Sequence, residues 1–440
     1  MVETVAIIGA GPSGVLLAHY LLRRGDRYKV DIYERRSDPQ TIVFSSSRTF
    51  LISLNPRGIN ALSNIEGLVE IVTGMSVEST GSVFHQTNGK TRFTPRRNPI
   101  FILDRTQLTI ALLQKSTKTY DQSRLNLYFN HQCTKLDFAS KTATFQKNQT
   151  AEITINYDLL IGADGAKSIV REKFLSTELF ELEQKYIPTD YKSIFLPNSV
   201  ETSTKTATDE LKSGYVHAWR LENGTGVLMV HQLDGSMSGV ITFPRDRNSV
   251  VTLATAAEVL QFFRQHFPEI GQIISESEAI EFLNRPVSSI LTIICSHYHY
   301  EDSVLLIGDA AHAMSPSLGQ GCNSAMEDAA IVDELLNEYS DNLAMASAKF
   351  TERRKSDAHA VVELSDNVFP SFNKKLIIEF IIRQQLAQIL HRLFPKYFSP
   401  SLLELISGTT IPYSTILSTH RRWISRVKKA NRKFLERAFK

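Results

Sequence analysis

The sequence is poor in cysteine and tryptophan and has no long apolar run. Its 440 residues include 3 Cys and 2 Trp. Because Cys133, Cys295 and Cys322 are widely separated, they form neither a disulfide framework nor a metal-ligand pattern, and we expect no bound metal. No apolar run approaches the roughly 18 residues of a membrane-spanning helix. The amino terminus also lacks the basic segment and cleavage site of a signal peptide. These absences predict a cytoplasmic protein.

An excess of charge of one sign is also lacking. The chain has 49 Lys and Arg against 46 Asp and Glu, a net charge of +3, so its overall charge gives no reason to expect a nucleic-acid partner. The carboxyl end differs: residues 421–440 hold nine Lys or Arg and one acid, Glu436, with Trp423, Val427 and Ala430 at helical spacing. We favour a helix that docks on its own protein and keeps a basic face in solvent. Peripheral contact with an anionic membrane surface is the alternative.

The stretch TVAIIGAGPSGVLLAHYLLRRG has the pattern of a dinucleotide-binding turn. An apolar strand runs into Gly9, Gly11 and Gly14, which allow a tight turn, close backbone approach to a pyrophosphate and packing of the following helix. The next strand ends on Glu34, where a carboxylate binds an adenosine ribose and repels a 2′-phosphate. The pattern predicts an FAD or NAD site without separating the two. The predicted cofactor contacts here are Gly9, Gly11, Pro12, Ser13, Gly14, Glu34 and Arg35.

Two further strand ends carry an aspartate followed by small residues. YDLLIGADGAKSIVR places Asp164 and Gly165 after an apolar strand, a pattern that a structural helix cap also explains. VLLIGDAAHAMSPSLGQGCNSAMEDA places Asp309 at the carboxyl end of another strand, where α/β sheets bind ligands. The small residues of the turn at 316–323 allow flat contact with a ring. We therefore expect a diol on Asp309 and a flat ring against the turn.

Together the three motifs resemble the single-component (group A) FAD-dependent aromatic hydroxylases. The segments SRTFLISLNPRGINAL, QKYIPTDYKSIFLP and FFRQHFPEI extend the resemblance to the kynurenine 3-monooxygenases and violacein-pathway oxygenases of that family. The resemblance implies that the first motif holds the ADP part of FAD, that the middle motif lies near the pyrophosphate, and that Asp309 binds the ribityl chain. It also implies cofactor contacts from Arg48, Arg105, Cys133, Asp164, Gly165, Gly308, Pro316, Gly319, Gln320, Gly321, Cys322 and Asn323.

The expected architecture is α/β and similar to para-hydroxybenzoate hydroxylase. A doubly wound FAD-binding domain is interrupted by an antiparallel-sheet substrate domain, in which alternating stretches such as GVLMVHQL predict strands. A helical C-terminal region is expected to cap the substrate cavity. The predicted boundaries are 1–75, 100–178 and 288–345 for the FAD-binding domain, 76–99 and 179–287 for the substrate domain, and 346–440 for the helical region.

The resemblance implies a monooxygenase that uses NADPH or NADH and O₂ to hydroxylate an aromatic small molecule through a flavin hydroperoxide. The protein must position the reacting carbon and exclude water. A reductase or dehydrogenase without oxygen insertion and a non-catalytic FAD binder are the alternatives. A flavin-dependent halogenase is excluded, because its W-x-W-x-I-P motif cannot form from Trp219 and Trp423 alone.

The expected substrate-binding positions differ from those of the kynurenine 3-monooxygenases. That group holds the amino-acid carboxylate of its substrate with an arginine, tyrosines and an asparagine. An arginine–carboxylate pair is strong and directional, so its loss predicts a different, less zwitterionic aromatic substrate of secondary metabolism. Kynurenine itself stays the alternative, since Arg96 or Arg97 could return the charge. The corresponding positions here hold Glu78 and Thr80, Pro99, Val368 (with Asn367 beside it) and Leu403.

Three residues of the late turn are candidates for catalysis: Gln320, His312 and Pro316. For His312 we favour packing under the turn with a hydrogen bond to backbone over a role as acid or base. The tract SHYHY at 296–300 is interpreted as a strand and not as a metal site. Aromatic strand residues are more often core than cavity lining. This applies to Tyr191, Tyr215, His217, Trp219, Met229 and Phe243.

Overall fold

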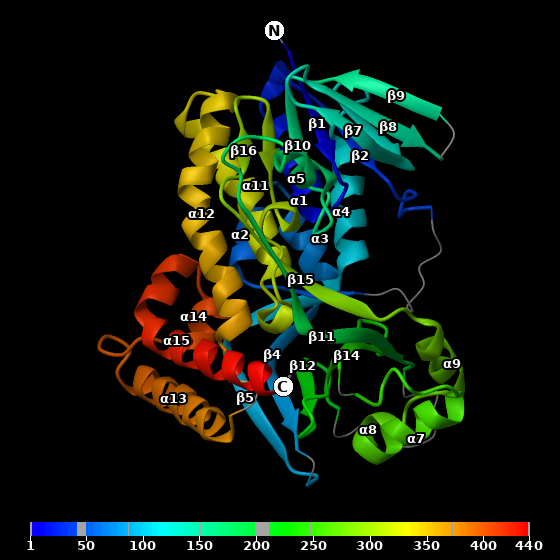
Figure 1. Ribbon diagram of the computed structural model, residues 1–440, viewed down its shortest axis with the longest axis vertical. Helices are drawn as coiled ribbons and strands as arrows, with labels where there is room; N and C mark the ends of the chain where they lie inside the picture. Colours follow the sequence, from blue (N-terminus) through cyan, green and yellow to red (C-terminus); the bar gives the residue numbers. More distant parts are fainter. Residues whose placement is uncertain are drawn as a thin grey trace.

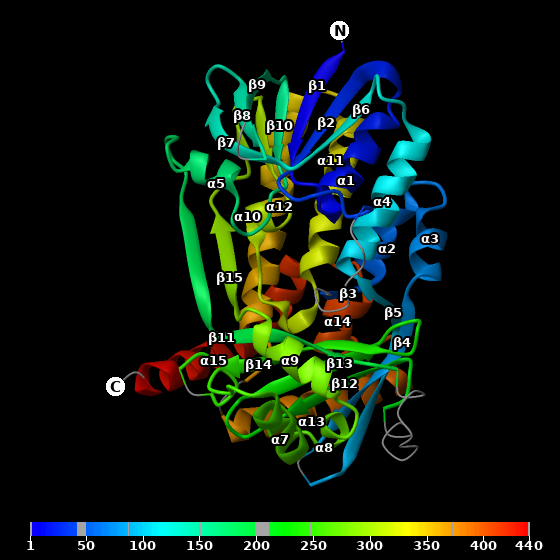
Figure 2. The same cartoon turned by 90° about the vertical axis from the view of Figure 1, so that its right-hand side faces the viewer.

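Two large sheets lie at opposite ends of the structure, which is a computed structural model, and helices pack between and beside them (Figure 1). The view turned by 90° shows the same two ends, with strands β11 and β15 running from one toward the other (Figure 2). The structure describes residues 2–41, 50–86, 88–148, 151–198, 211–246, 248–370 and 373–438, with the backbone alone for 434–438.

The first sheet has six strands in the order β16-β17-β10-β1-β2-β6. Every pair is parallel except β16 and β17. The central strands are apolar and buried, as expected where helices cover a parallel sheet on both faces. This arrangement confirms the predicted doubly wound fold. The elements are β1 (Glu3–Ile8), α1 (Pro12–Leu22), β2 (Tyr28–Glu34), α4 (Arg105–Thr119), β6 (Leu125–Phe129), β10 (Leu159–Gly162), β16 (His299–Tyr300), β17 (Val304–Leu306) and α11 (Gly321–Glu338).

The second sheet has eight strands in the order β15-β11-β14-β13-β12-β4-β5-β3. It is mixed, because β4 and β12 pair in parallel; the expectation of a purely antiparallel sheet is wrong for this pair, which joins two distant segments. Strands β3, β15 and the end of β5 come from segments predicted for the FAD-binding domain. The elements are β3 (Leu51–Leu54), β4 (Val77–His85), β5 (Thr91–Asp104), β11 (Leu182–Leu196), β12 (Tyr215–Arg220), β13 (Gly226–His231), β14 (Met237–Pro244) and β15 (Ser288–Cys295).

The two faces of this second sheet have different surroundings. One face packs on helices α7 (Ala256–His266), α8 (Pro268–Gly271) and α9 (Glu276–Asn284) through an apolar cluster. Trp219, Met229 and Phe243 belong to this cluster and are core residues. The other face carries a smaller cluster made of Ile100, Ile102, Val216 and Val230.

A small third sheet and four further helices complete the amino-terminal and central parts. The third sheet has the order β7-β8-β9, and its first strand lies beside β2 and α5. The elements are α2 (Pro56–Ser63), α3 (Leu68–Gly74), β7 (His131–Asp137), β8 (Thr142–Lys147), β9 (Ala151–Asn156), α5 (Ile169–Phe174) and α10 (Asp309–His312).

The carboxyl end is helical, as expected. It consists of α12 (Leu343–Asn367), α13 (Lys374–Leu393), α14 (Leu402–Gly408) and α15 (Tyr413–Ala438). Trp423 and Val427 of α15 are buried in an apolar cluster shared with the other three helices, and Ala430 packs against it. Docking of the basic helix on its own protein is thereby confirmed for these residues. None of the described helices has the length and apolar character needed to cross a membrane.

Candidate cofactor and active site

The amino-terminal turn between β1 and α1 requires glycine at two positions. Gly9 has φ +106°, and a Cβ there would lie 2.4 Å from the carbonyl oxygen of Ala163. A Cβ on Gly14 would lie 2.4 Å from the carbonyl oxygen of Gly9. Gly11 differs, because a Cβ on it would meet nothing within 4 Å. The turn is thus tightly packed on the protein side and open at Gly11, as a pyrophosphate cradle must be.

The first helix opens directly from this turn. Pro12 is its first residue, and Ser13 is buried beside it. The N–H groups of a first helical turn have no intrahelical partner, and Pro12 contributes none. The helix end therefore offers N–H groups and partial positive charge toward the open side of the turn.

The Glu34 carboxylate at the end of β2 already accepts hydrogen bonds from backbone groups of the chain. The donors are the backbone N–H of Ala10 at 3.0 Å and of Arg36 at 2.9 Å. Arg35 is exposed beside it. Sequence reasoning missed Arg36, whose pKa is lowered by burial, with Arg105 and Arg35 adding to the effect. These arginines gather positive charge near the turn; Arg48, predicted to join them, lies outside the described residues.

The middle motif connects the other two. The Asp164 carboxylate accepts from the N–H of Ile169 at 2.8 Å, and its Oδ1 is buried without a partner among the described residues. Burial raises the pKa of Asp164. Gly165 has φ +83° with open space before it. Arg171 donates to the carbonyl oxygens of Ala166 and Ala310, which fixes the middle motif to the late one.

Two cysteines lie close to these motifs. Cys133 is buried beneath Asp164, and burial raises the pKa of its thiol to about 12. Burial likewise raises the pKa of Cys322 to about 12, with Arg105 and Asp309 close by. Both thiols therefore stay protonated at neutral pH, so neither can act as a thiolate nucleophile. Their place is in packing around the cofactor site.

The late motif presents an aspartate from a strained strand end. Gly308 has φ +60°, and a Cβ on it would lie 3.0 Å from the Oγ of Ser13, so the late motif packs tightly on α1. Asp309 follows and is exposed, and no hydrogen bond or ion pair of its side chain is found among the described residues. A free carboxylate next to two glycine turns fits the hydroxyls of a polyol chain.

The Asn323 side chain ties the turn from Pro316 to Asn323 to backbone groups of β3 and of Asn55, the residue before α2. Pro316 is exposed at the start of this turn, and Gly319, with φ +65°, ends the short helical turn Pro316–Leu318 within it. The Asn323 amide donates to the carbonyl oxygens of Ser53 at 2.7 Å and Gly319 at 3.0 Å, and its Oδ1 accepts from a backbone N–H. The Asn323 side chain is fully engaged and positions the turn. The N–H groups of Gly321 and Cys322, which begin α11, remain for a ligand.

Gln320 is also buried and engaged. Its Oε1 accepts hydrogen bonds from Asn55 Nδ2 at 2.8 Å and from the hydroxyl of Tyr413 at 2.8 Å, and its Nε2 donates to the carbonyl oxygen of Leu318. The geometry makes Gln320 a positioning residue of the turn. Sequence reasoning missed Asn55 and Tyr413. The pair Asn55-Pro56, which has a helix N-cap followed by proline, is a signal that could have pointed to Asn55.

His312 lies buried under the turn. Its Nε2 is 2.7 Å from Oδ2 of Asp328, which also accepts from the N–H of Gly308. Arg354 donates to the other oxygen of Asp328 at 2.6 Å. The partner of His312 is therefore a carboxylate and not the expected backbone group, yet the arrangement favours packing over acid–base work. The sequence carried no signal for Arg354, which comes from α12.

No group of three or more metal-ligating side chains occurs among the described residues. His299 and Tyr300 of the SHYHY tract form β16, as expected, and His297 and Tyr298 precede it. The orphaned Asp164 Oδ1, the open space at Gly11 and the free Asp309 are the features that fit a dinucleotide with a polyol linker.

Comparison with known proteins decides the family. The FAD binding domain family matches residues 2–365. The chain is a FAD-dependent aromatic monooxygenase. Kynurenine 3-monooxygenase of Drosophila willistoni is 32% identical over 95% of this chain and 90% of its own. The enzyme of the same name from Legionella pneumophila (strain Corby) is 30% identical over 94% of this chain and 90% of its own.

Solved structures show the same fold. The oxygenase of 2-methyl-3-hydroxypyridine-5-carboxylic acid aligns with a TM-score of 0.65 at 19% identity, over 86% of this chain and 96% of its own. PqsL of Pseudomonas aeruginosa aligns with a TM-score of 0.66 at 18% identity, over 87% of this chain and all of its own. The predicted cofactor, FAD, with NADPH or NADH as co-substrate, is thereby confirmed for the family.

Proposed function

We propose that this enzyme hydroxylates an aromatic small molecule that is less zwitterionic than kynurenine, with NAD(P)H and O₂ as co-substrates, in the biosynthesis of a secondary metabolite. One observation carries the proposal: Met314, just before the turn at 316–323, and Leu318, within it, share an apolar cluster with Val368 and Leu403. Val368 and Leu403 occupy positions at which the kynurenine 3-monooxygenases are expected to present polar side chains. An apolar cover at this place favours a ring over an amino-acid group.

The other expected substrate positions support this. Glu78 is exposed and pairs with Phe101 on the sheet face that turns away from the Ile100 cluster. Pro99 has no side-chain donor, and the Asn367 amide donates to the carbonyl oxygen of Glu363 in its own helix. None of these side chains offers a guanidinium to a carboxylate.

Arg96 favours kynurenine itself as the second candidate. Its Nη1 donates to the Oγ of Ser79 at 3.3 Å and to the carbonyl oxygen of Gly81 at 2.9 Å. Ser79 lies opposite Ile100 on the face that carries the small apolar cluster. No carboxylate of the described residues pairs with Arg96, and burial lowers its pKa. Arg97 instead contacts His391 of α13. Arg96 thus presents a charge that an acidic substituent of the substrate could meet.

FAD supplies the redox and oxygen chemistry when bound; the chain's residues bind, orient and exclude water. We assign the phosphates to the N–H groups around Gly11 and Ser13, and the polyol to Asp309. Gly321 and Cys322 present N–H groups to the electron-rich edge of the ring, where the start of α11 adds positive charge. In this assignment the six-stranded sheet carries the cofactor, and the eight-stranded sheet with the C-terminal helices encloses the substrate.

The test is NAD(P)H oxidation by the purified yellow protein, with O₂ and H₂O₂ followed together against an aromatic panel that includes kynurenine. Stimulation by an uncharged or singly charged aromatic with formation of hydroxylated product supports the proposal. Hydroxylation of kynurenine, lost on Arg96→Gln but unaffected by Arg97→Gln, would establish the second candidate. NAD(P)H oxidation without oxygen insertion with any compound would instead indicate a reductase.

A further inference from the structure

Helix α13 presents an apolar stripe to solvent. Ile378, Ile382, Leu386, Ile389 and Leu393 follow at spacings of three or four residues, and each is between 50% and 63% exposed. The other side of the helix packs into the C-terminal apolar cluster. The α13 stripe, defined by these five residues, is therefore a second apolar face that no described part of the chain covers. Single exposed apolar residues are ordinary, whereas a contiguous patch indicates a contact surface.

The stripe continues into an aromatic group. Beyond the end of α13, Phe394, Tyr397 and Phe398 are all exposed, and Tyr397 is 84% exposed. Tyrosine concentrates where a membrane meets water, because its ring enters the apolar layer while its hydroxyl stays hydrated, and phenylalanine adds to the apolar face of helices that lie in this interface. The position and composition of this group match such an interface.

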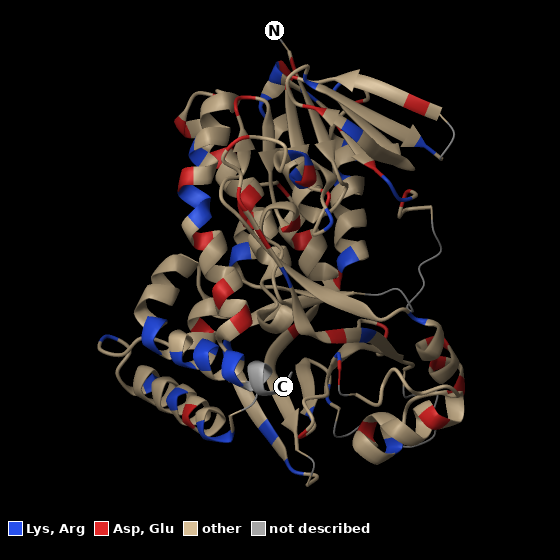
Figure 3. Ribbon diagram, in the orientation of Figure 1, with Lys and Arg blue, Asp and Glu red and all other residues tan. Residues whose placement is uncertain are grey.

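The charges of the segment that carries the stripe are almost all positive. Between residues 374 and 398 the only acid is Glu379, which pairs with Arg383 and Arg426. The neighbouring α15 adds further basic positions along its length (Figure 3). An apolar stripe with basic flanks is complementary to an anionic lipid surface. The basic residues of this segment are Lys374, Lys375, Arg383, Arg392 and Lys396.

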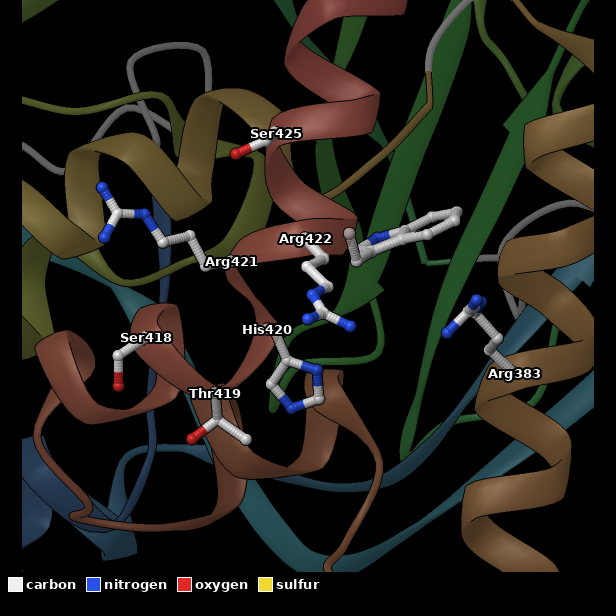
Figure 4. A pocket seen from close by; sticks show the side chains of 8 residues that line it. Arg383, Ser418, Thr419, His420, Arg421, Arg422 and Ser425 are labelled. Atoms are coloured by element: carbon white, nitrogen blue, oxygen red, sulfur yellow. The ribbon is translucent and has the colours of Figure 1, made fainter.

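A basic groove lies along α15 beside Arg383 of α13. It has a volume of about 700 Å³, and Arg383, His420 and Arg422 point toward its interior (Figure 4). Burial lowers the pKa of His420, with the Arg383 charge as the second cause. Buried atoms Nε2 of His420 and Nε1 of Trp423 have no partner among the described residues. The indole N–H of Trp423 is a donor, and Nε2 of a neutral His420 is a donor when it carries the ring proton, so a phosphate group could satisfy both.

We infer that the α13 stripe and the basic groove dock this enzyme on the surface of an anionic lipid bilayer. Helix α13 lies in the plane of the membrane with its stripe in the acyl boundary, and lipid phosphates occupy the groove. A two-fold contact between two copies through the stripe would bring the basic flanks of both against one another, which is unfavourable. The surface does not depend on the identity of the substrate.

The test is co-flotation of the FAD-loaded enzyme with vesicles of phosphatidylcholine alone or mixed with phosphatidylglycerol. We expect binding to the mixed vesicles only, weakened by salt. The double variant Ile382→Glu/Leu386→Glu should weaken binding by about tenfold or more, because charge in the acyl boundary is costly. Arg421→Gln/Arg422→Gln should weaken it by about tenfold through lost attraction.

Matched controls separate this from general effects of charge. Ile280→Glu on α9 changes an equally exposed apolar residue far from the stripe, and Lys90→Gln/Lys118→Gln removes two exposed charges elsewhere. Both should bind like the unchanged enzyme, and all variants should keep their FAD absorbance. Absence of binding to the mixed vesicles, or equal loss in the controls, overturns the inference. So does a concentration-dependent dimer that Ile382→Glu/Leu386→Glu abolishes without any vesicle binding.

Discussion

The hydroxyl of Tyr413, at the start of the last helix, donates a hydrogen bond of 2.8 Å to Oε1 of Gln320 in the turn at 316–323. Arg57 lies 3.8 Å over the Tyr413 ring and pairs with Glu327 of α11. The carboxyl-terminal helix is therefore bonded directly to the turn that is assigned to the ring of the cofactor. A change in the position of α15 would therefore alter the hydrogen bonding of Gln320.

Tyr413→Phe removes one of the two donors to Gln320 Oε1 and leaves Asn55 as the other. We expect the free energy of unfolding to fall by about 1 kcal/mol. We also expect a larger share of NAD(P)H consumption to end in H₂O₂, because a looser turn admits water. Chemical denaturation and the ratio of H₂O₂ to product measure the two effects. Tyr186→Phe, a change at a half-exposed tyrosine, should alter neither.

The cofactor motifs were predictable because their signals are local. Gly9 and Gly14 are required by backbone contacts within a single strand–turn–helix unit, and Asp309 follows its strand directly. The motif shows in the sequence wherever a few consecutive residues must adopt special conformations. The doubly wound sheet follows from the same units.

The remaining parts of the site depend on tertiary contacts. Tyr413 and Gln320 are 93 residues apart, and nothing near Tyr413 marks it as a partner of the turn. Arg96 is a candidate substrate contact because of the side of β5 on which it lies. A one-residue shift of register would place it on the other side. The α13 stripe was not predicted from the sequence, because its exposure depends on which of two apolar faces the neighbouring helices cover.

Gly11→Ala tests the cofactor assignment without disturbing the fold. A Cβ on Gly11 meets no protein atom within 4 Å. We therefore expect the free energy of unfolding of the FAD-free protein to stay unchanged or to rise by up to about 0.5 kcal/mol. The methyl group would instead occupy the space assigned to the pyrophosphate, so FAD affinity should fall by about tenfold or more. Fluorescence titration of the FAD-free protein measures the affinity.

Gly9→Ala provides the contrast to this result. Its Cβ would press on the Ala163 carbonyl at 2.4 Å and its φ of +106° disfavours alanine, so it should destabilise the protein itself. Unchanged FAD affinity in Gly11→Ala would contradict the assignment of the pyrophosphate to this turn.

Asp328→Asn should strongly destabilise the protein. Burial alone would raise the pKa of Asp328, but the charges of His312 and Arg354 outweigh it and lower the pKa. The substitution leaves the buried Arg354 without its closest carboxylate, which costs about 3–5 kcal/mol of unfolding free energy. Glu352→Gln, which breaks an exposed pair with Lys349, should cost less than about 1 kcal/mol. Equal losses in the two variants would contradict a buried network.

A buried histidine predicts how stability depends on pH. Burial lowers the pKa of His217 to about 4. Its Nε2 donates to the carbonyl oxygen of Lys212 at 2.9 Å, so its Nδ1 accepts from Nε2 of His85 at 3.0 Å. A proton on Nδ1 would break this arrangement, so the folded protein keeps His217 neutral where the unfolded chain is protonated.

The unfolded chain therefore binds more protons between about pH 6.5 and pH 4, and stability must fall as pH falls through this window. The contribution of His217 is about 2–3 kcal/mol, complete above the unfolded pKa and lost by pH 4. His217→Gln should lower stability at neutral pH but flatten its dependence on pH in this window by about one proton. Urea denaturation at a series of pH values measures the slope. An unchanged slope in His217→Gln would show that His217 is protonated in the folded state.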